Sequence, residues 1–192
     1  MYGIIGEHPT DVDTLKVLVK KIAKNNAVKV HVKGYGGAGQ LFRKGAKQLT
    51  QFSGAPHYCQ RFIVCYDSDG NDPKERHRAV ANKIIKPSKV KNPCCILIPV
   101  QELEAWILAD IQAVQNVITS WAPKEITNPE AISKPKEHLE KLSRASNKRP
   151  RYDHTLHNDK VAAYLDLAKV AAKCVSFRPL INFVERGIPN HP

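Results

Sequence analysis

The first hundred residues alternate between short apolar runs and longer segments in which apolar residues recur every three or four positions. Four apolar runs have the length of strands and cover residues 2–6, 27–32, 61–66 and 95–100. The segments between them, residues 10–23, 41–52 and 76–85, have the spacing of amphipathic helices that pack on a sheet. This order predicts an α/β fold, with a Rossmann-like four-stranded parallel sheet between helices.

The start of the first helix carries a capping signal. Thr10 and Asp13 have the Thr-x-x-acid spacing of a capping box, in which each side chain bonds the other residue's backbone N–H. We therefore expect this helix to begin near Thr10.

Beyond Val100 the pattern changes, because no further strand signal follows. Apolar spacing predicts helices over residues 105–117, 160–173 and 177–186. We therefore expect two parts: an α/β domain over residues 1–110 and a basic helical region over residues 111–192 that packs on it.

The charge of the chain narrows the class of partner. Its 192 residues include 30 lysines and arginines against 18 acids, a formal net charge of +12. This balance favours polyanions, because binding releases their condensed counterions, and nucleic acid is favoured over an anionic membrane surface. A basic surface that only maintains solubility is the alternative interpretation.

One segment concentrates basic residues. The stretch from Pro123 to Pro150 is rich in lysine, arginine and proline, and Ser143 to Arg151 is expected to form a mobile basic loop. The expected nucleic-acid contacts lie in or just after this stretch: Lys134, Lys136, Arg144, Lys148, Arg149, Arg151 and His154.

Cysteine spacing and hydropathy indicate the cellular compartment in which the protein is expected. The five cysteines are odd in number and form no C-x-x-C pair, so neither a disulfide framework nor a structural zinc site is expected. The N-terminus turns acidic at Glu7, which is untypical of a signal peptide, and no apolar run approaches the roughly 18 to 20 residues that span a bilayer. We expect a cytoplasmic protein that does not bind membranes, and the oligomeric state stays open.

Acidic residues follow three of the predicted strands. Glu7 comes after the first, Asp67 and Asp69 after the third, and Glu104 after the fourth, with Asp11 one helical turn beyond Glu7. In an open parallel sheet, ligands bind outside the carboxyl ends of the strands. We therefore expect these five carboxylates to meet at one edge, with neighbouring Glu102 as a weaker candidate than Glu104.

Hard divalent cations prefer such oxygen ligands, so the pattern predicts one or two Mg²⁺ or Mn²⁺ ions held by these carboxylates. Each acid also has a structural explanation taken alone. Asp67 to Gly70 has the composition of a tight turn, Glu7 suits a helix N-terminus, and Glu104 suits a solvated helix face. Their joint placement at strand ends favours the metal site.

The same residues resemble the Toprim domain, the catalytic module of topoisomerases, bacterial primases and the OLD nucleases. The Toprim pattern is a glutamate after the first strand and Asp-x-Asp after the third, matched by Glu7 and Asp67-Ser68-Asp69. Three further motifs are similar to the Toprim-like DUF4276 family: Gly6-Glu7 with Asp11, the Glu102 to Asp110 segment ELEAWILAD, and the Ser176 to Phe183 segment SFRPLINF.

This resemblance implies an activity. A Toprim-like chain of this kind would be a metal-dependent nuclease that hydrolyses phosphodiester bonds of DNA or RNA, with Glu7, Asp67, Asp69 and Glu104 in the catalytic site. The family often has a lysine before the threonine that aligns with Thr155, but here that residue is His154. Lys160 is then the other candidate for a basic catalytic residue.

The resemblance also implies partners. OLD nucleases join the Toprim module to an ATPase, and this chain lacks the G-x-x-x-x-G-K-[ST] signature. A separate ATPase of the ABC or AAA type is then the expected partner, in an anti-phage defence system. The alternative is a non-catalytic Toprim-like module that binds nucleic acid or a partner protein.

Three other motifs carry competing interpretations. Gly34 to Gly39 satisfies G-x-G-x-x-G but follows the second strand and lacks the acid that dinucleotide binding requires about 20 residues later. Asp67 to Asp72 has its glycine at the wrong position for an EF-hand. His154 and His157 with Asp153 are expected to be surface groups rather than zinc ligands.

Overall fold

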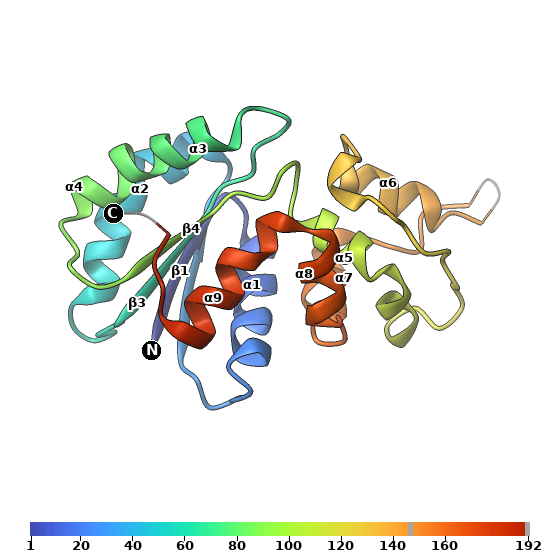
Figure 1. The fold of residues 1–192 in the computed structure, drawn as a ribbon, viewed down its shortest axis with the longest axis horizontal. Helices are drawn as coiled ribbons and strands as arrows, with labels where there is room; N and C mark the ends of the chain where they lie inside the picture. The colour runs from blue at the N-terminus through green and yellow to red at the C-terminus, as the bar shows by residue number, and fades with distance from the viewer. Residues whose placement is uncertain (146–147, 191–192) are drawn as a thin grey trace.

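The sheet has four parallel strands, in the order β2-β1-β3-β4. The computed structural model describes residues 1–145 and 148–190, and its strands are β1 (Tyr2–Gly6), β2 (Val30–Gly34), β3 (Arg61–Cys65) and β4 (Cys94–Leu97) (Figure 1). In the register of the sheet, Gly6 lies between Gly34 and Cys65, and Cys65 lies beside Leu97. All four strands thus end at one edge, and the predicted α/β fold is confirmed.

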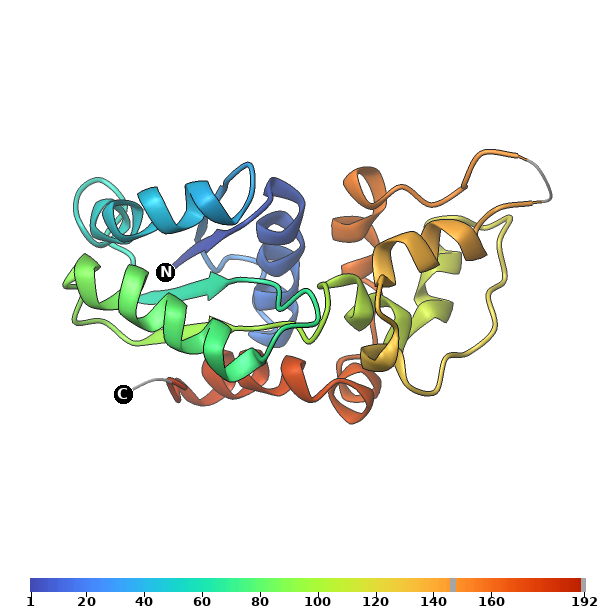
Figure 2. The ribbon, with the colours of Figure 1, turned by 90° about the horizontal axis from the view of Figure 1, so that it is seen from above.

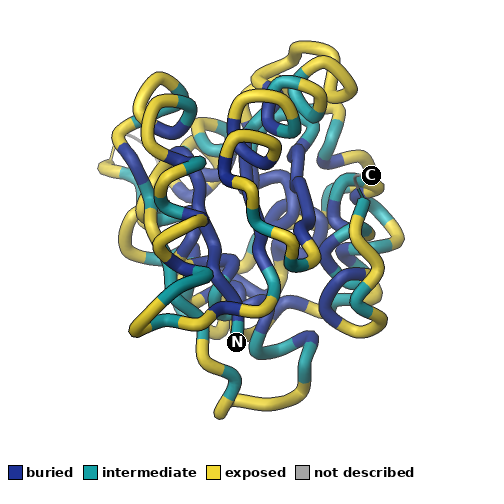
Figure 3. Tube along the Cα trace, turned by 90° about the vertical axis from the view of Figure 1, so that its left-hand side faces the viewer, coloured by how far each residue is buried: buried dark blue, intermediate teal, exposed yellow. Residues whose placement is uncertain are grey.

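Helices cover both faces of the sheet, as the alternation of apolar residues predicts. On one face lie α1 (Pro9–Ile22) and α9 (Arg178–Arg186), packed on Ile4 and Ile63. On the other lie α2 (Ala38–Ser53) and a helical run made of α3 (Pro73–Val80), the π-helical turn η1 (Ala81–Ile85) and α4 (Lys86–Ser88) (Figures 1 and 2). Strands β1, β3 and β4 are largely buried between these layers, whereas the edge strand β2 is only partly buried, and the outer surfaces of the layers are exposed (Figure 3).

The C-terminal helices form a second group beside the sheet (Figures 1 and 2). Its elements are α5 (Glu104–Ala109), the 3-10 helices Ile111–Asn116 and Pro129–Ala131, α6 (Pro135–Leu142), α7 (His154–Ala162), α8 (Leu167–Lys173) and the 3-10 helix Val175–Phe177. One apolar cluster runs from the sheet into this group. Trp106 lies within it, 5.0 Å from Phe177 between ring centroids, and its Nε1–H donates to Ser176 Oγ at 2.9 Å.

Some predicted boundaries are wrong. The helix expected over residues 160–173 is two helices, because Asp166 caps α8 by accepting bonds from two backbone N–H groups of its first turn. The second strand begins at Val30 rather than residue 27, since Ala27 N–H bonds Asn25 Oδ1 in the preceding turn. The expected basic loop over Ser143 to Arg151 includes residues 146–147, which lie outside the described residues.

The capping box expected at Thr10 and Asp13 is also wrong. Helix α1 begins at Pro9, and the Asp11 carboxylate accepts the backbone N–H of His8 at 3.2 Å. Proline suits the first helical position because its missing N–H would have no partner there. Asp11 therefore has a capping role two residues before the predicted one.

The glycine-rich loop serves close packing at the start of α1 and α2. A Cβ at Gly34 would lie 2.3 Å from Pro9 N, so no larger residue fits. Gly37 has φ 105°, which favours glycine, and its N–H donates to Glu7 O at 3.0 Å. These contacts explain glycine at positions 34 and 37 without a dinucleotide.

Strand β4 forms an outer edge of the sheet, and Asn190 covers part of it. The Asn190 side chain accepts from Ile96 N at 2.8 Å and donates to Ile96 O at 2.7 Å. Its amide thus replaces one residue of a neighbouring strand. In the part of the chain that the structure describes, no helix combines the length and apolar character needed to cross a bilayer.

Candidate functional site

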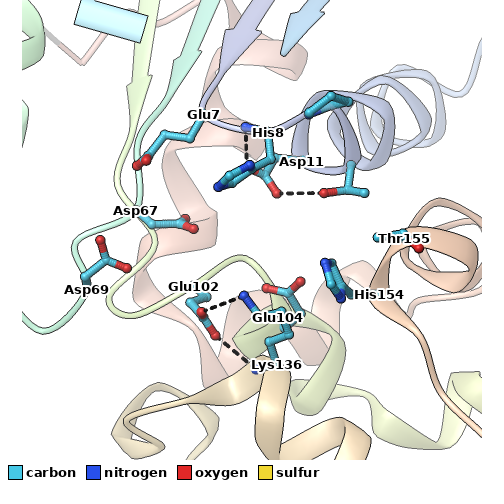
Figure 4. A pocket seen from close by; sticks show the side chains of 12 residues that line it. Glu7, His8, Asp11, Asp67, Asp69, Glu102, Glu104, Lys136, His154 and Thr155 are labelled. Atoms are coloured by element: carbon cyan, nitrogen blue, oxygen red, sulfur yellow. Dashed lines mark hydrogen bonds and ion pairs between the residues drawn. The ribbon is translucent and has the colours of Figure 1, made fainter. Parts of the chain in front are cut away.

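A cleft of about 500 Å³ lies at the edge where the strands end, between the sheet and the C-terminal helices (Figure 4). We call it the acidic cleft. Its lining residues are Glu7, His8, Pro9, Thr10, Asp11, Asp67, Asp69, Glu102, Glu104, Lys136, His154 and Thr155. The cleft thus contains every carboxylate that the sequence places after a strand, together with Asp11.

The topology explains why these acids meet. Strands β1 and β3 are neighbours in register, so Glu7 after one and Asp67 after the other emerge side by side. Asp69 follows in the left-handed region at φ 48°, which aspartate tolerates better than most residues. Glu104 opens α5 on the opposite wall, and the four carboxylates face the cleft from these separate elements (Figure 4).

Several of these carboxylates are buried, and two of them hold an oxygen without a hydrogen-bond partner among the described residues. Glu7 is 9% exposed and Asp11 6%. Glu7 Oε1 and Asp67 Oδ1 are shielded from solvent and have no hydrogen-bond partner among the described residues. A buried carboxylate oxygen without a partner costs free energy, so the folded chain maintains an arrangement that a bound cation would relieve.

The environment raises the pKa of these acids. Burial, together with the charge of Asp69, raises the pKa of Glu7 to about 6. Burial and the nearby Glu104 raise the pKa of Asp11 to about 7. The pKa of Asp67 is raised further above its usual range, first by burial and then by the charge of Asp11. Carboxylates that repel one another in a poorly solvated site are typical of functional sites.

The wall formed by the C-terminal helices holds its acid in place. Asn158 Nδ2 on α7 donates to Glu104 Oε1 at 2.9 Å, and Tyr152 Oη donates to Asn158 Oδ1 at 2.5 Å. Glu104 is only 4% exposed. Burial raises the pKa of Glu104, and the bond from Asn158 opposes that rise. This buried series orients one carboxylate toward the cleft.

Lys136 contributes a positive charge to the cleft. Its Nζ lies 3.4 Å from Glu102 Oε1, and its backbone N–H donates to Glu102 Oε2 at 3.0 Å. Glu102 therefore fixes both the first turn of α6 and the lysine. Burial, followed by the charges of Lys136 and His154, lowers the pKa of His8 on the opposite wall.

The other predicted basic residues lie elsewhere. Lys160 is exposed on α7 and does not line the cleft, whereas His154 does. Lys134 is exposed where α6 begins. The remaining predicted contacts, Arg144, Lys148, Arg149 and Arg151, belong to the segment between α6 and α7, which lies at the end of the molecule far from the sheet (Figures 1 and 2).

The donor set fits a hard cation in its chemistry. The acids offer only oxygen ligands, and two buried oxygens lack partners. As positioned, however, no three Asp, Glu, His or Cys side chains of the described residues are close enough together to hold one ion. Glu7, Asp11, Asp67, Asp69 and Glu104 are the residues that could hold one or two ions after small side-chain movements.

Sequence reasoning missed three contributors to this site. Asn158 orients Glu104, and its position one turn after His154 on α7 was the available signal. Lys136 was expected to contact nucleic acid along the basic segment rather than inside the cleft. Arg76 was not considered, yet its guanidinium donates to Tyr66 Oη and to Ser68 O, and its charge opposes the raised pKa of Glu7.

Comparison with known proteins identifies a family. A family model described as "Domain of unknown function (DUF4276)" matches residues 6–185, a range that contains every residue lining the cleft. No curated protein matches the chain, and no solved structure matches it.

Proposed function

The chain belongs to the DUF4276 family, and we propose that it is a metal-dependent nuclease that hydrolyses phosphodiester bonds of DNA or RNA. One observation carries the proposal. A chain of net charge +12 brings six carboxylates together in a single cleft, three of them buried, and two buried carboxylate oxygens there have no partner among the described residues. Acids that can hold a cation and a basic exterior that attracts a polyanion are the features expected of a metal-dependent nuclease.

We propose that Glu7, Asp67 and Asp69 hold one Mg²⁺ or Mn²⁺ ion and that Asp11 and Glu104 contribute to a second. When bound, such ions polarise a phosphoryl group and lower the pKa of water. The Toprim likeness supports this assignment, since Glu7 follows the first strand and the two aspartates follow the third, its neighbour in the sheet.

The chain's own groups have separate roles in this proposal. Asp11 Oδ2 accepts the backbone N–H of His8, which fixes the orientation of this carboxylate in the cleft. Lys136 Nζ, anchored on Glu102, places a positive charge beside an entering phosphate. Asn158 keeps Glu104 directed at the cleft.

A second candidate is a Toprim-like module that binds nucleic acid or a partner protein without cutting it. The separation of the carboxylates favours it, because no three potential ligands of the described residues are grouped closely enough for one ion. The cleavage assay below distinguishes the two candidates.

We also propose a biological context. As the OLD likeness implies, the nuclease would act as the effector of an anti-phage defence system together with a separately encoded ATPase. The given sequence supports a separate ATPase in one respect: it contains no phosphate-binding G-x-x-x-x-G-K-[ST] loop of its own.

The test is cleavage of supercoiled plasmid and of a labelled RNA by the full chain with Mn²⁺, Mg²⁺ or EDTA. We expect nicking with Mn²⁺ and none with EDTA. Asp69→Asn should lower the rate by about 100-fold or more, beyond the usual loss for a residue that only supports a metal ligand. Asparagine also tolerates the left-handed backbone at this position, so the fold should persist.

Asp72→Asn is the matched control. Asp72 is exposed, lies three residues from Asp69 and accepts Lys74 N–H at the start of α3, a role that asparagine keeps. Its rate should match that of the wild-type protein. Absence of cleavage of both substrates with either cation, while binding persists, would favour the non-catalytic module.

A further inference from the structure

On the α2 side of the sheet, α2, η1 and α4 carry cations that are not compensated by acids, whereas α3 contains Glu75, which pairs with Arg78. Arg43, Lys44 and Lys47 on α2, Lys83 on η1 and Lys86 on α4 are all exposed, and these helices contain no Asp or Glu. We call these five residues the α2–α4 ridge. Among the described residues, no carboxylate lies within ion-pair distance of any of them.

The ridge is one surface because its helices pack closely. A Cβ at Gly45 would meet Ile84 Cγ2 at 3.2 Å, so glycine lets α2 approach η1. Thr50 Oγ1 on α2 donates to Ser88 O on α4 at 2.9 Å. The cations of both helices therefore lie on adjoining faces, and their positive potentials add.

A series of contacts made by two cations, with two aromatic rings in edge-to-face contact between them, connects the ridge to the acidic cleft. Lys83 Nζ lies 5.3 Å from the Phe42 ring centroid, and Phe42 meets Tyr66 edge to face at 5.0 Å. Arg76 Cζ lies 4.7 Å from the Tyr66 ring on the other side. Tyr66 immediately precedes Asp67, so the series ends at the cleft wall.

The composition of the ridge indicates its partner. Apolar or aromatic side chains usually stand beside the charges in a protein hot spot and in a helix that inserts into a membrane surface. None of the large apolar side chains that the described part of the chain exposes lies on α2, η1 or α4. Closely spaced lysines and arginines without apolar anchors suit the regular charge of a phosphodiester backbone.

We infer that the α2–α4 ridge, with Arg76 at its inner end, binds the phosphate backbone of a nucleic acid whose strand continues into the acidic cleft. This surface replaces the segment around Arg144 to Arg151 as the main contact, because the described residues on either side of positions 146–147 lie toward the end of the C-terminal helices that faces away from the sheet (Figure 2). Entry of the strand into the cleft rests on the proposed nuclease function, whereas binding to the ridge does not.

The test compares two fourfold variants with the same change in net charge. The ridge variant combines Arg43→Gln, Lys44→Gln, Lys47→Gln and Lys83→Gln. The control combines Lys134→Gln, Arg144→Gln, Lys148→Gln and Arg149→Gln. Anisotropy of a labelled 30-base-pair DNA and of an RNA of the same sequence is measured in EDTA at several salt concentrations, so that cleavage plays no part.

The measured slope is that of the logarithm of the binding constant against the logarithm of the salt concentration. For the ridge variant we expect this slope to be smaller in magnitude by about three to four, since each lost phosphate contact removes about 0.9 from it. We also expect its Kd at low salt to be at least about tenfold higher. The control should change the slope by less than about one. Equal effects of both variants, or a larger effect of the control, would overturn the inference. So would loss of binding to phosphatidylserine vesicles with DNA binding unchanged.

Two measurements keep the result interpretable. Circular dichroism and Tm establish folding, and the pair Arg43→Gln with Lys47→Gln replaces the fourfold variant if that one does not fold. The ridge substitutions are repeated with Asp69→Asn. If Asp69→Asn abolishes cutting but leaves binding intact, the nuclease proposal survives even if the ridge substitutions do not weaken binding. If the ridge substitutions weaken binding but no cutting is detected in any variant, the ridge inference survives although the nuclease proposal does not.

Discussion

The two parts of the molecule that meet at the acidic cleft use their charges differently. In the C-terminal helices, acids bond neighbouring elements: Asp110 pairs with Lys169 at 3.0 Å and Glu125 with Lys173 at 2.7 Å. In the α/β part, Glu7 and Asp67 hold oxygens without partners in the described residues, and the α2–α4 ridge holds unpaired cations. Charges are thus paired with one another in the first part, whereas in the second we propose that ligands supply the missing partners.

The largest expected effect tests whether the two parts fold as one. Trp106 is fully buried, and Trp106→Ala should lower the free energy of unfolding by about 3 to 5 kcal/mol through lost burial and the cavity left behind. Because the apolar cluster is continuous, urea transitions followed by circular dichroism and by Trp121 fluorescence should shift together.

Val175→Ala is the control for this substitution. Val175 is exposed beside the same contact, so its replacement should change the free energy of unfolding by less than about 0.5 kcal/mol. Separate transitions for the two signals in Trp106→Ala would show that the parts unfold independently.

An intermediate effect follows from the raised pKa values. Asp11 and Glu7 bind protons more tightly in the folded chain, with pKa values of about 7 and about 6 against 3.8 and 4.5. The stability that these protons supply is present at low pH and is lost as pH rises through the folded values. The metal-free protein should therefore be less stable at pH 8 than at pH 5.5, by about 2 kcal/mol.

Asp11→Asn should reduce this difference while keeping the bond from His8 N–H, and the remainder should come from the other acids with raised pKa values. The paired acid Glu125 behaves oppositely, because the bond from Lys173 lowers its pKa and its contribution is already constant above pH 5.5. Denaturant melts at both pH values check the prediction. Equal stability at pH 5.5 and 8 in EDTA would contradict it, and Mn²⁺ at pH 8 should restore stability if the site binds it.

The smallest effect concerns the support of Glu104. Tyr152→Phe removes the hydroxyl that bonds Asn158 and should cost about 1 kcal/mol of stability. Because Asn158 still reaches Glu104, we expect cleavage to stay within tenfold of the wild-type rate. Asn158→Leu is the comparison, and it should lower the rate more than Tyr152→Phe does. Equal rates for the two variants would remove Asn158 from the site.

The α/β part and its acids could be predicted from sequence for a physical reason. Parallel strands that alternate with helices all end at one edge, so Glu7, Asp67 and Asp69 must lie near each other once the strands are recognised. The order of the apolar runs along the chain is therefore enough to predict that these three acids meet. In this part only the predicted ends of the elements were wrong. For example, α1 begins at Pro9 with Asp11 as its capping acid, and not near Thr10 with Asp13.

The C-terminal wall could not be predicted in the same way. Its contributions depend on how short helices pack, and neither Lys136 nor Asn158 lies in a repeating pattern. The break between α7 and α8 contains no glycine or proline, and Asp166 marks it only once the fold is known. The role of Arg76 likewise becomes visible only in the structure, where its guanidinium lies over the Tyr66 ring. Tyr66 is ten residues earlier in the chain, so no local sequence pattern indicates this contact.

The amide of Asn190 has a consequence for behaviour at high concentration. Open strand edges attract the edges of other molecules, and proteins that expose them tend to aggregate. Here Asn190 occupies the backbone groups of Ile96 on β4, while exposed Lys29 and Lys33 place like charges along β2 at the opposite edge. Hydrogen bonds from Asn190 thus occupy one edge, and charge repulsion between lysines protects the other. Both edges of the sheet are therefore prevented from pairing with strands of other molecules.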